Sequence, residues 1–231
     1  MRSPPVAVWS ATVSTAPPTA RLLAALSDDE RQRAERFGRD ADRDRFVVGR
    51  AGLRQILGRR LGRTPRSLTF SYGAWGKPVL AAPTAPPFSV SHSGDVVIWS
   101  VSAQRAVGVD IEAVPSGDVD PDLRKLALSA REGHLLAALP ENERTEWFYT
   151  GWVFKEACAK ALGLGLALPP DQIDVVPSLL GGARTVRVDG LPHPVSVALL
   201  NAPLGYRAAL ALVGPRRTAP PPVRPWDWSE G

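Results

Sequence analysis

Gly108-Val109-Asp110-Ile111-Glu112 combines apolar residues with two carboxylates that stand two positions apart. This alternation is typical of a β-strand, on which successive side chains point to opposite faces. We therefore expect Asp110 and Glu112 on one face and the apolar side chains on the other, in a core. Neighbouring carboxylates repel each other unless a cation lies between them, and a hard divalent cation such as Mg2+ prefers oxygen ligands. A solvated acidic strand end is the alternative interpretation.

The composition indicates a soluble globular protein of one or two domains. The chain has 231 residues, of which 44% are hydrophobic. It has no apolar run long enough for a transmembrane helix and no secretory h-region near its N-terminus, so we expect no membrane partner. The single cysteine, Cys158, cannot form an internal disulfide and suits a cytoplasmic location. One cysteine excludes a zinc site built on cysteines, and three scattered histidines do not favour one built on histidines.

The net charge of +5 comes mainly from arginine and predicts attraction to anions such as nucleic acid, nucleotides or an acidic protein. A basic nucleic-acid-binding protein is therefore one alternative. It is disfavoured because the arginines between residues 31 and 50 are interleaved with acids, which is typical of a solvated helix face, and because no nucleic-acid motif is present.

The apolar periodicity and the Gly/Pro turns predict helices and strands in both parts of the chain. We expect helices over 31–63, 122–129, 129–139 and 141–162. We expect strands over 6–13, 68–72, 88–90, 96–102, 107–112, 173–177, 185–188, 195–200 and 205–213. Helices followed by β-rich segments occur twice, which suggests a duplicated α/β unit. The Pro- and Arg-rich segment 215–231 is expected to be a flexible tail, whose Trp226 and Trp228 either dock on the body or lie in a disordered segment.

The Ser-His-Ser-Gly segment 91–94 is expected to form a polar turn between two strands. These strands and the Asp110 strand would then form a meander, with His92 and the carboxylate pair on one sheet. A serine beside a histidine also suggests nucleophilic catalysis. That interpretation is disfavoured because adjacent residues rarely meet in triad geometry and no G-x-S-x-G elbow is present.

Three polar or aromatic residues of the expected helix 141–162 form one stripe, because Trp152, Glu156 and Lys160 follow each other at intervals of four. An exposed Glu–Lys helix pair is the alternative to a functional role for this stripe. Gly163 and Gly165 are expected to end the helix.

Four motifs occur in order: G-x-x-G-K-P at Gly73–Pro78, F-S-V-S-H-S-G at Phe88–Gly94, G-V-D-I-E at Gly108–Glu112 and W-V-F-K-E-A-C-A-K at Trp152–Lys160. This set resembles the 4'-phosphopantetheinyl transferases of the surfactin-synthetase-activating type. The resemblance implies an α+β fold of two similar α/β halves related by a pseudo-two-fold axis. Each half would be a small, mainly antiparallel sheet packed with helices, with the active site in the cleft between them.

The implied halves are residues 1–105, with coenzyme A phosphate and adenine contacts, and 106–214, with the metal site and catalysis. The tail 215–231 follows them. The implied reaction transfers the 4'-phosphopantetheine arm of coenzyme A to a serine of an apo acyl or peptidyl carrier protein and releases adenosine 3',5'-bisphosphate. The implied metal is Mg2+, with Mn2+ as the alternative. We expect an acidic carrier protein, no nucleic-acid partner and a monomer, and the W-x-x-K-E-A form implies carriers of polyketide or non-ribosomal peptide synthases.

The resemblance also implies roles for individual residues. Metal ligands would be Asp110, Glu112 and Glu156; catalytic residues would be Glu156 and Lys160; coenzyme contacts would come from Arg33, Arg45, Lys77, Ser91, His92 and Lys160. Glu156 is the expected base for the serine, with Asp110 or a metal-bound water as alternatives. A family position that is often lysine falls on Glu30, which leaves open how many basic residues hold the phosphates. A non-catalytic relative that binds coenzyme A is a further alternative.

Overall fold

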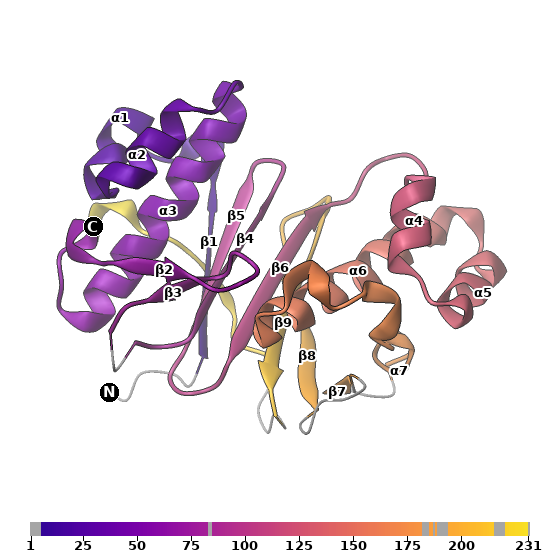
Figure 1. Cartoon of the computed structure of the whole chain (residues 1–231). Coiled ribbons are helices and arrows are strands. Elements are labelled where there is room, and N and C mark those ends of the chain that lie inside the picture. Colours follow the sequence, from indigo (N-terminus) through magenta and orange to yellow (C-terminus); the bar gives the residue numbers. More distant parts are fainter. Residues whose placement is uncertain are drawn as a thin grey trace.

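The computed structural model describes residues 6–82, 85–181, 185–186, 188, 194–214 and 220–230. The described chain forms two four-stranded sheets and a hairpin (Figure 1). The first sheet has the order β10-β1-β5-β4, with bounds Val223–Pro225, Val6–Thr12, Val96–Ser102 and Phe88–Ser93. The second has the order β6-β9-β8-β7, with bounds Val107–Ala113, Tyr206–Val213, Val195–Leu200 and Thr185–Val186. The hairpin joins β2 (Phe70–Tyr72) to β3 (Pro78–Leu80).

Helices accompany each sheet. With the first sheet are α1 (Thr19–Leu22), α2 (Asp28–Glu35) and α3 (Asp40–Leu61). With the second are α4 (Pro121–Ala127), α5 (Ala130–Ala138), α6 (Glu141–Leu162) and α7 (Val176–Leu179). Short 3-10 turns are η1 (Val13–Thr15), η2 (Leu23–Ala25), η3 (Pro65–Ser67), η4 (Gly165–Ala167), η5 (Pro170–Gln172) and η6 (Trp228–Glu230). No helix in the described ranges has the length and apolarity needed to cross a bilayer.

Strand alternation distributes the core between the layers. On β5, Val97 and Trp99 pack in a cluster with α3, whereas Val96 and Ile98 enter a cluster that also contains Val109 of β6. The first sheet therefore packs on helices with one face and shares a core with the second sheet on the other. Helix α6 packs against β8 and β9 in a further cluster. The mixed helix and antiparallel-sheet architecture agrees with the α+β class expected from the sequence.

The predicted meander is wrong. Strands β4 and β5 belong to the first sheet, whereas β6 starts the second and pairs antiparallel with β9, with Asp110 opposite Ala209. The segment 91–93 also differs from the expected turn, because Ser91, His92 and Ser93 lie within β4. The chain reverses one residue later, at Gly94, whose φ of 52° suits a residue without a side chain. Strand β4 still runs beside β6 (Figure 1).

Three other expected segments differ from the structure. The helix expected over 31–63 is divided into α2 and α3, with a break at 36–39 around Gly38. The strand expected over 173–177 reduces to one bridge between Ile173 and Val188, and the chain then enters α7. Of the strand expected over 185–188, Thr185–Val186 form β7 and Val188 forms the bridge to Ile173, while residue 187 lies outside the described residues.

The described part of the C-terminal tail packs on the first sheet, whereas the sequence predicts a flexible segment. Strand β10 pairs parallel with β1 and extends the first sheet. Trp226 is buried in the core of that sheet and its helices, and its Nε1 donates to Gln55 Oε1 at 3.1 Å. Docking of Trp226 is one of the two outcomes that the sequence left open, whereas the pairing of β10 with β1 was not expected. Residues 215–219 and 231 of the expected tail lie outside the described residues.

Candidate active site

Side chains from β4, β6 and α6 meet around the carboxylate of Asp110. This side chain is 1% exposed, and its Oδ1 accepts hydrogen bonds from Lys160 Nζ at 2.5 Å and from Ser91 Oγ at 2.7 Å. Lys160 Nζ also donates to Ser91 Oγ at 2.8 Å. The predicted residues Asp110, Lys160 and Ser91 are therefore in direct contact, although they come from three separate elements.

The absence of a side chain at Gly108 allows α6 to pack this close to β6. A Cβ atom at Gly108 would lie 2.0 Å from the carbonyl oxygen of Ala157 and 2.4 Å from the amide nitrogen of Ala161. Helix α6 therefore rests directly on the strand backbone. Because Glu156 and Lys160 lie one turn apart on α6, this contact brings both toward Asp110.

The other two predicted carboxylates lie in the same electrostatic environment. Burial is the largest effect that raises the pKa of Glu112, followed by repulsion from Asp110, while hydrogen bonds from Ser93 and Trp152 lower it. Burial also raises the pKa of Glu156, opposed by the charge of Lys160 and assisted by repulsion from Asp110 and Glu112. The three carboxylates therefore sense one another, as expected for acids gathered in one site.

Lys160 supplies the positive charge of this group. Burial by itself lowers the pKa of Lys160, but the charge and hydrogen bond of Asp110, with the charges of Glu156 and Glu112, raise it overall. The ammonium therefore stays protonated at neutral pH and compensates the buried Asp110.

One oxygen of the group is suited to a cation. Asp110 Oδ2 is buried and has no hydrogen-bond partner, which is costly for a carboxylate oxygen. In the described part of the chain, however, no three His, Cys, Asp or Glu side chains form a complete ligand set. The three carboxylates predicted as ligands are thus near each other without a preformed three-ligand cage. The donor chemistry fits Mg2+, which commonly takes one or two carboxylates and completes its shell with water and phosphates.

Two of the residues predicted to contact coenzyme A, Arg45 and His92, are neighbours. Arg45 on α3 donates from Nε to the carbonyl oxygen of Gly94 at 2.9 Å, at the turn that follows His92. His92 lies on β4 with part of its side chain exposed. Desolvation of the imidazole is the main effect that lowers its pKa, and the positive charges of Arg45 and Lys160 lower it further. A bound anion would relieve this repulsion. Arg33 lies exposed on α2, with its guanidinium 5.0 Å from the centre of the Phe46 ring.

Lys77 has backbone partners. From the turn between β2 and β3, its Nζ donates to the carbonyl oxygens of Lys160 at 2.5 Å and Val107 at 3.2 Å. Burial lowers its pKa to about 8. Lys77 therefore joins the hairpin to the end of α6 and the start of β6, and in this conformation its ammonium is directed at carbonyls.

A pocket of about 290 Å³ lies between the hairpin, β4 and the end of α6. Its polar lining includes Lys77, Glu156 and Lys160, and Trp75 of the hairpin turn contributes an aromatic ring. Three residues predicted from the sequence thus line one pocket. This pocket lies next to Asp110, because Lys160 both lines it and contacts Asp110.

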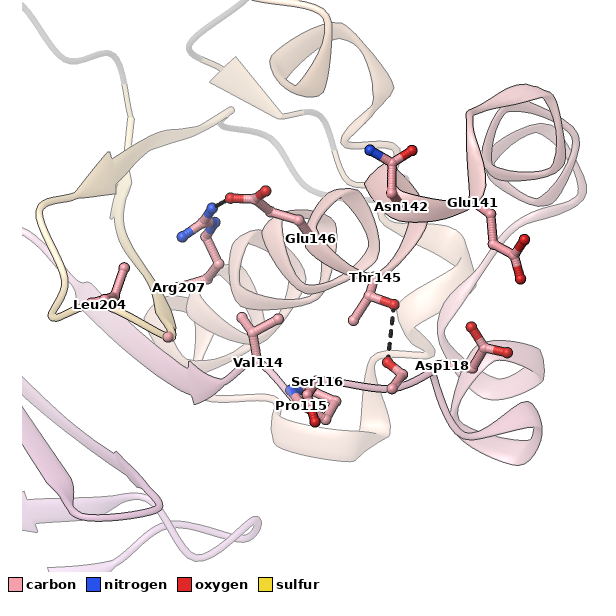
Figure 2. A pocket seen from close by; sticks show the side chains of 12 residues that line it. Val114, Pro115, Ser116, Asp118, Glu141, Asn142, Thr145, Glu146, Leu204 and Arg207 are labelled. Atoms are coloured by element: carbon pink, nitrogen blue, oxygen red, sulfur yellow. Dashed lines mark hydrogen bonds and ion pairs between the residues drawn. The ribbon is translucent and has the colours of Figure 1, made fainter.

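A larger pocket, of about 690 Å³, lies beyond the end of β6 (Figure 2). The loop at Val114 forms one side, and the start of α6 forms the other, where Glu146 makes an ion pair with Arg207 of β9. Asp118 and Glu141 add further acidic groups. This acidic lining does not suit an acidic partner.

Sequence reasoning did not give the contacts that several residues make around the site. Ser93 donates to Glu112 Oε2 at 2.7 Å, and the alternating serines of F-S-V-S-H-S were a signal for a shared strand face. Lys155 is buried, and its Nζ donates to Glu132 Oε2 at 2.6 Å, which anchors α6 to α5 beside Glu156. Glu30 is also buried and pairs with Arg54 at 2.5 Å, so it stabilises the packing of α2 on α3.

Comparisons with known proteins agree with the motifs. Residues 106–210 match the family model of the 4'-phosphopantetheinyl transferase superfamily, and residues 8–104 match that of the 4'-phosphopantetheinyl transferase N-terminal region. A 4'-phosphopantetheinyl transferase of Bacillus subtilis is 32% identical over 195 residues, which cover 84% of this chain and 85% of that protein. The Sfp transferase of Bacillus subtilis strain 168 is 27% identical over the same shares.

A further relative is the 4'-phosphopantetheinyl transferase HetI of Nostoc sp., which is 39% identical over 150 residues. That match covers 63% of this chain and 63% of HetI, slightly less than two thirds of either protein. The Bacillus subtilis match covers a larger share of both proteins. The chain belongs to the 4'-phosphopantetheinyl transferase superfamily.

Proposed function

We propose that this protein transfers the 4'-phosphopantetheine arm of coenzyme A to a serine hydroxyl of an apo carrier protein and releases adenosine 3',5'-bisphosphate. The observation that carries the proposal is the contact of buried Asp110 with Lys160, beside a pocket that Lys160 and Glu156 also line. The serine oxygen forms a bond to the β-phosphorus of the coenzyme, and the bond from that phosphorus to the bisphosphate leaving group breaks. The pyrophosphate of the coenzyme brings negative charge into the site, and more negative charge develops on the leaving group as the bond breaks.

Asp110 and Glu112 would hold a Mg2+ ion from β6, with Glu156 as a third carboxylate from α6. The partnerless Asp110 Oδ2 supports this assignment. When bound, the ion supplies Lewis-acid stabilisation of the pyrophosphate. Mn2+ is the alternative metal, because it shares the preference for oxygen ligands.

Lys160 and Glu156 would carry the remaining chemistry. The Lys160 ammonium is protonated and stabilises the negative charge that grows on the leaving phosphate. The Glu156 carboxylate accepts the proton of the attacking serine. Its raised pKa makes it a stronger base than an exposed glutamate, which supports this role.

We further propose that the coenzyme lies in a cleft between two pseudo-symmetric halves, 1–105 and 106–214. His92 and Arg45 would hold its 3'-phosphate, and their proximity at the β4–β5 turn supports this role. Lys77, Ser91 and Arg33 would contribute further contacts. For Lys77 this requires its ammonium to leave the carbonyls of Val107 and Lys160.

The proposed partner is an acidic acyl or peptidyl carrier protein of a polyketide or non-ribosomal peptide synthase. The enzyme itself is proposed to be monomeric and cytoplasmic. The net charge of +5 favours association with an acidic partner. The acidic pocket beyond β6 favours docking elsewhere on the surface.

The direct test is to incubate the protein with coenzyme A, Mg2+ and several apo carrier domains, and to weigh the carriers by mass spectrometry. We expect a phosphopantetheine mass gain that Asp110→Asn abolishes and that Asp118→Asn, an exposed loop control, leaves unchanged. An absence of mass gain on every carrier would refute the proposal. Full activity of Asp110→Asn would refute the metal assignment.

A further inference from the structure

A row of serines replaces backbone pairing between the two sheets. Strands β4 and β6 run side by side, but no backbone ladder joins them in the described residues. Ser89, Ser91 and Ser93 alternate along β4, so their side chains share the face toward β6. Each of the three hydroxyls makes at least one hydrogen bond to β6.

Two of these hydroxyls accept hydrogen bonds from backbone amides of β6. The amide of Val109 donates to Ser89 Oγ at 3.1 Å, and the amide of Ala113 donates to Ser93 Oγ at 3.1 Å. Without these acceptors, both amides would need other partners at a strand edge that faces the interior. The serine row therefore fixes the register between β4 and β6.

The same row holds both carboxylates of β6. Ser91 donates to Asp110 Oδ1 and Ser93 donates to Glu112 Oε2, each at 2.7 Å. A hydroxyl has one proton to donate. Because Ser93 already accepts from a backbone amide, its proton is directed at Glu112, and because Ser91 accepts from Lys160, its proton is directed at Asp110. One oxygen of each carboxylate is thereby held by a strand of the other sheet.

We infer that Ser91 and Ser93 are positioning residues, which orient Asp110 and Glu112 toward a divalent cation. This inference rests on the proposed function. His92 lies between the two serines on the opposite face of β4, so the same strand would set the spacing between the coenzyme phosphate and the carboxylates. Removal of a group that hydrogen-bonds to a metal ligand commonly lowers metal affinity by about 10–100-fold.

Ser93 gives the cleaner test, because Ser91 also contacts Lys160. Binding of Mn2+ alone to the full chain would be measured by electron paramagnetic resonance, and the Mg2+ dependence of carrier modification would be measured separately. For Ser93→Ala we expect about 10-fold or more weaker Mn2+ binding, a KM for Mg2+ raised to a similar extent, and a kcat at saturating Mg2+ close to wild type. Ser93→Thr, which keeps the hydroxyl, should restore both values.

Ser100→Ala is the matched control. Ser100 is a buried serine of β5 whose Oγ has no hydrogen-bond partner, and its removal should leave Mn2+ binding unchanged. Mn2+ affinity of Ser93→Ala within about threefold of wild type would overturn the inference. If wild type binds Mn2+ but modifies no carrier, the proposed function is refuted. The positioning role is then decided by the Mn2+ affinities of wild type and Ser93→Ala alone. Should Ser93→Ala not fold, Ser93→Cys provides the same comparison.

Discussion

Replacing Gly108 by alanine tests whether the packing of α6 on β6 builds the site. The new Cβ would lie 2.0 Å from the Ala157 carbonyl oxygen and 2.4 Å from the Ala161 amide, both of them helix backbone atoms that no rotamer change can move away. An ordinary contact is about 3.5 Å, so α6 must retreat by about 1.5 Å at this point. Overpacking of this kind costs about 1–3 kcal/mol, occasionally more, in the free energy of unfolding.

The retreat of α6 would also carry Lys160 and Glu156 away from Asp110. The Lys160 Nζ to Asp110 Oδ1 distance of 2.5 Å cannot survive a shift of that size without rearrangement. A misplacement of about 1 Å can reduce a catalytic rate by about 100-fold. We therefore expect Gly108→Ala to lower both the denaturation midpoint and the rate of carrier modification.

Urea denaturation and mass-spectrometric carrier modification would measure the two effects. The matched control is Gly133→Ala on α5, where a Cβ meets nothing within 4 Å and helix propensity predicts a gain of about 1 kcal/mol. Wild-type stability together with wild-type activity for Gly108→Ala would show that the close contact does not determine the site. Lost activity with normal stability would mean that α6 moves at little energetic cost.

Lys155→Met should cost about 3–5 kcal/mol in urea denaturation, because it leaves the buried Glu132 without its cation. Adding Glu132→Gln should recover part of that loss; no recovery would show that packing, and not charge, dominates. Trp226→Ala should cost about 3–5 kcal/mol by the same assay, since it empties a buried position at the C-terminal end; a neutral result would indicate a tail that does not dock. His92→Ala should raise the KM for coenzyme A by about 10–100-fold, the value of a charge-assisted hydrogen bond, with a smaller change in kcat. Equal losses in kcat and kcat/KM would instead place His92 in the chemical step. Lys77 has a pKa of about 8 in the folded protein against 10.5 for an exposed lysine, so the unfolded chain binds more protons between these values and stability should rise with pH across that window. Lys77→Met should remove this rise relative to wild type, and identical pH–stability curves would contradict the low pKa.

Local signals in the sequence sufficed for the elements that carry the chemistry. Helix α6 spans Glu141–Leu162 as expected, because Pro140 precedes it and Gly163 ends it with a φ of 74°. The strand with Asp110 and Glu112 also forms where the alternation predicts it. Both expectations rest on features within a few residues of each element, which is the range over which capping and periodicity act.

Sheet membership could not be obtained in this way. The partner of β6 is β9, which lies about a hundred residues further along the chain. The alternating pattern of β6 is compatible with pairing to a strand nearby in the sequence and equally with pairing to a distant one. The pairing of the tail could not be predicted for the same reason, because β10 pairs with β1, about two hundred residues earlier in the chain. The close approach at Gly108 was likewise hidden, since a glycine in a strand can mark a turn, a bulge or a near neighbour.

The charge balance of the site depends on the directions of two lysines, which no sequence pattern specifies. Three carboxylates, those of Asp110, Glu112 and Glu156, act on one another, and Lys160 is the cation in contact with Asp110. Lys77 lines the pocket beside Glu156 and Lys160, but its ammonium is directed at backbone carbonyls and not at the carboxylates. The carboxylates therefore outnumber the cations directed at them. A divalent cation would correct this imbalance, and the anionic coenzyme would then meet a site whose charge favours its binding.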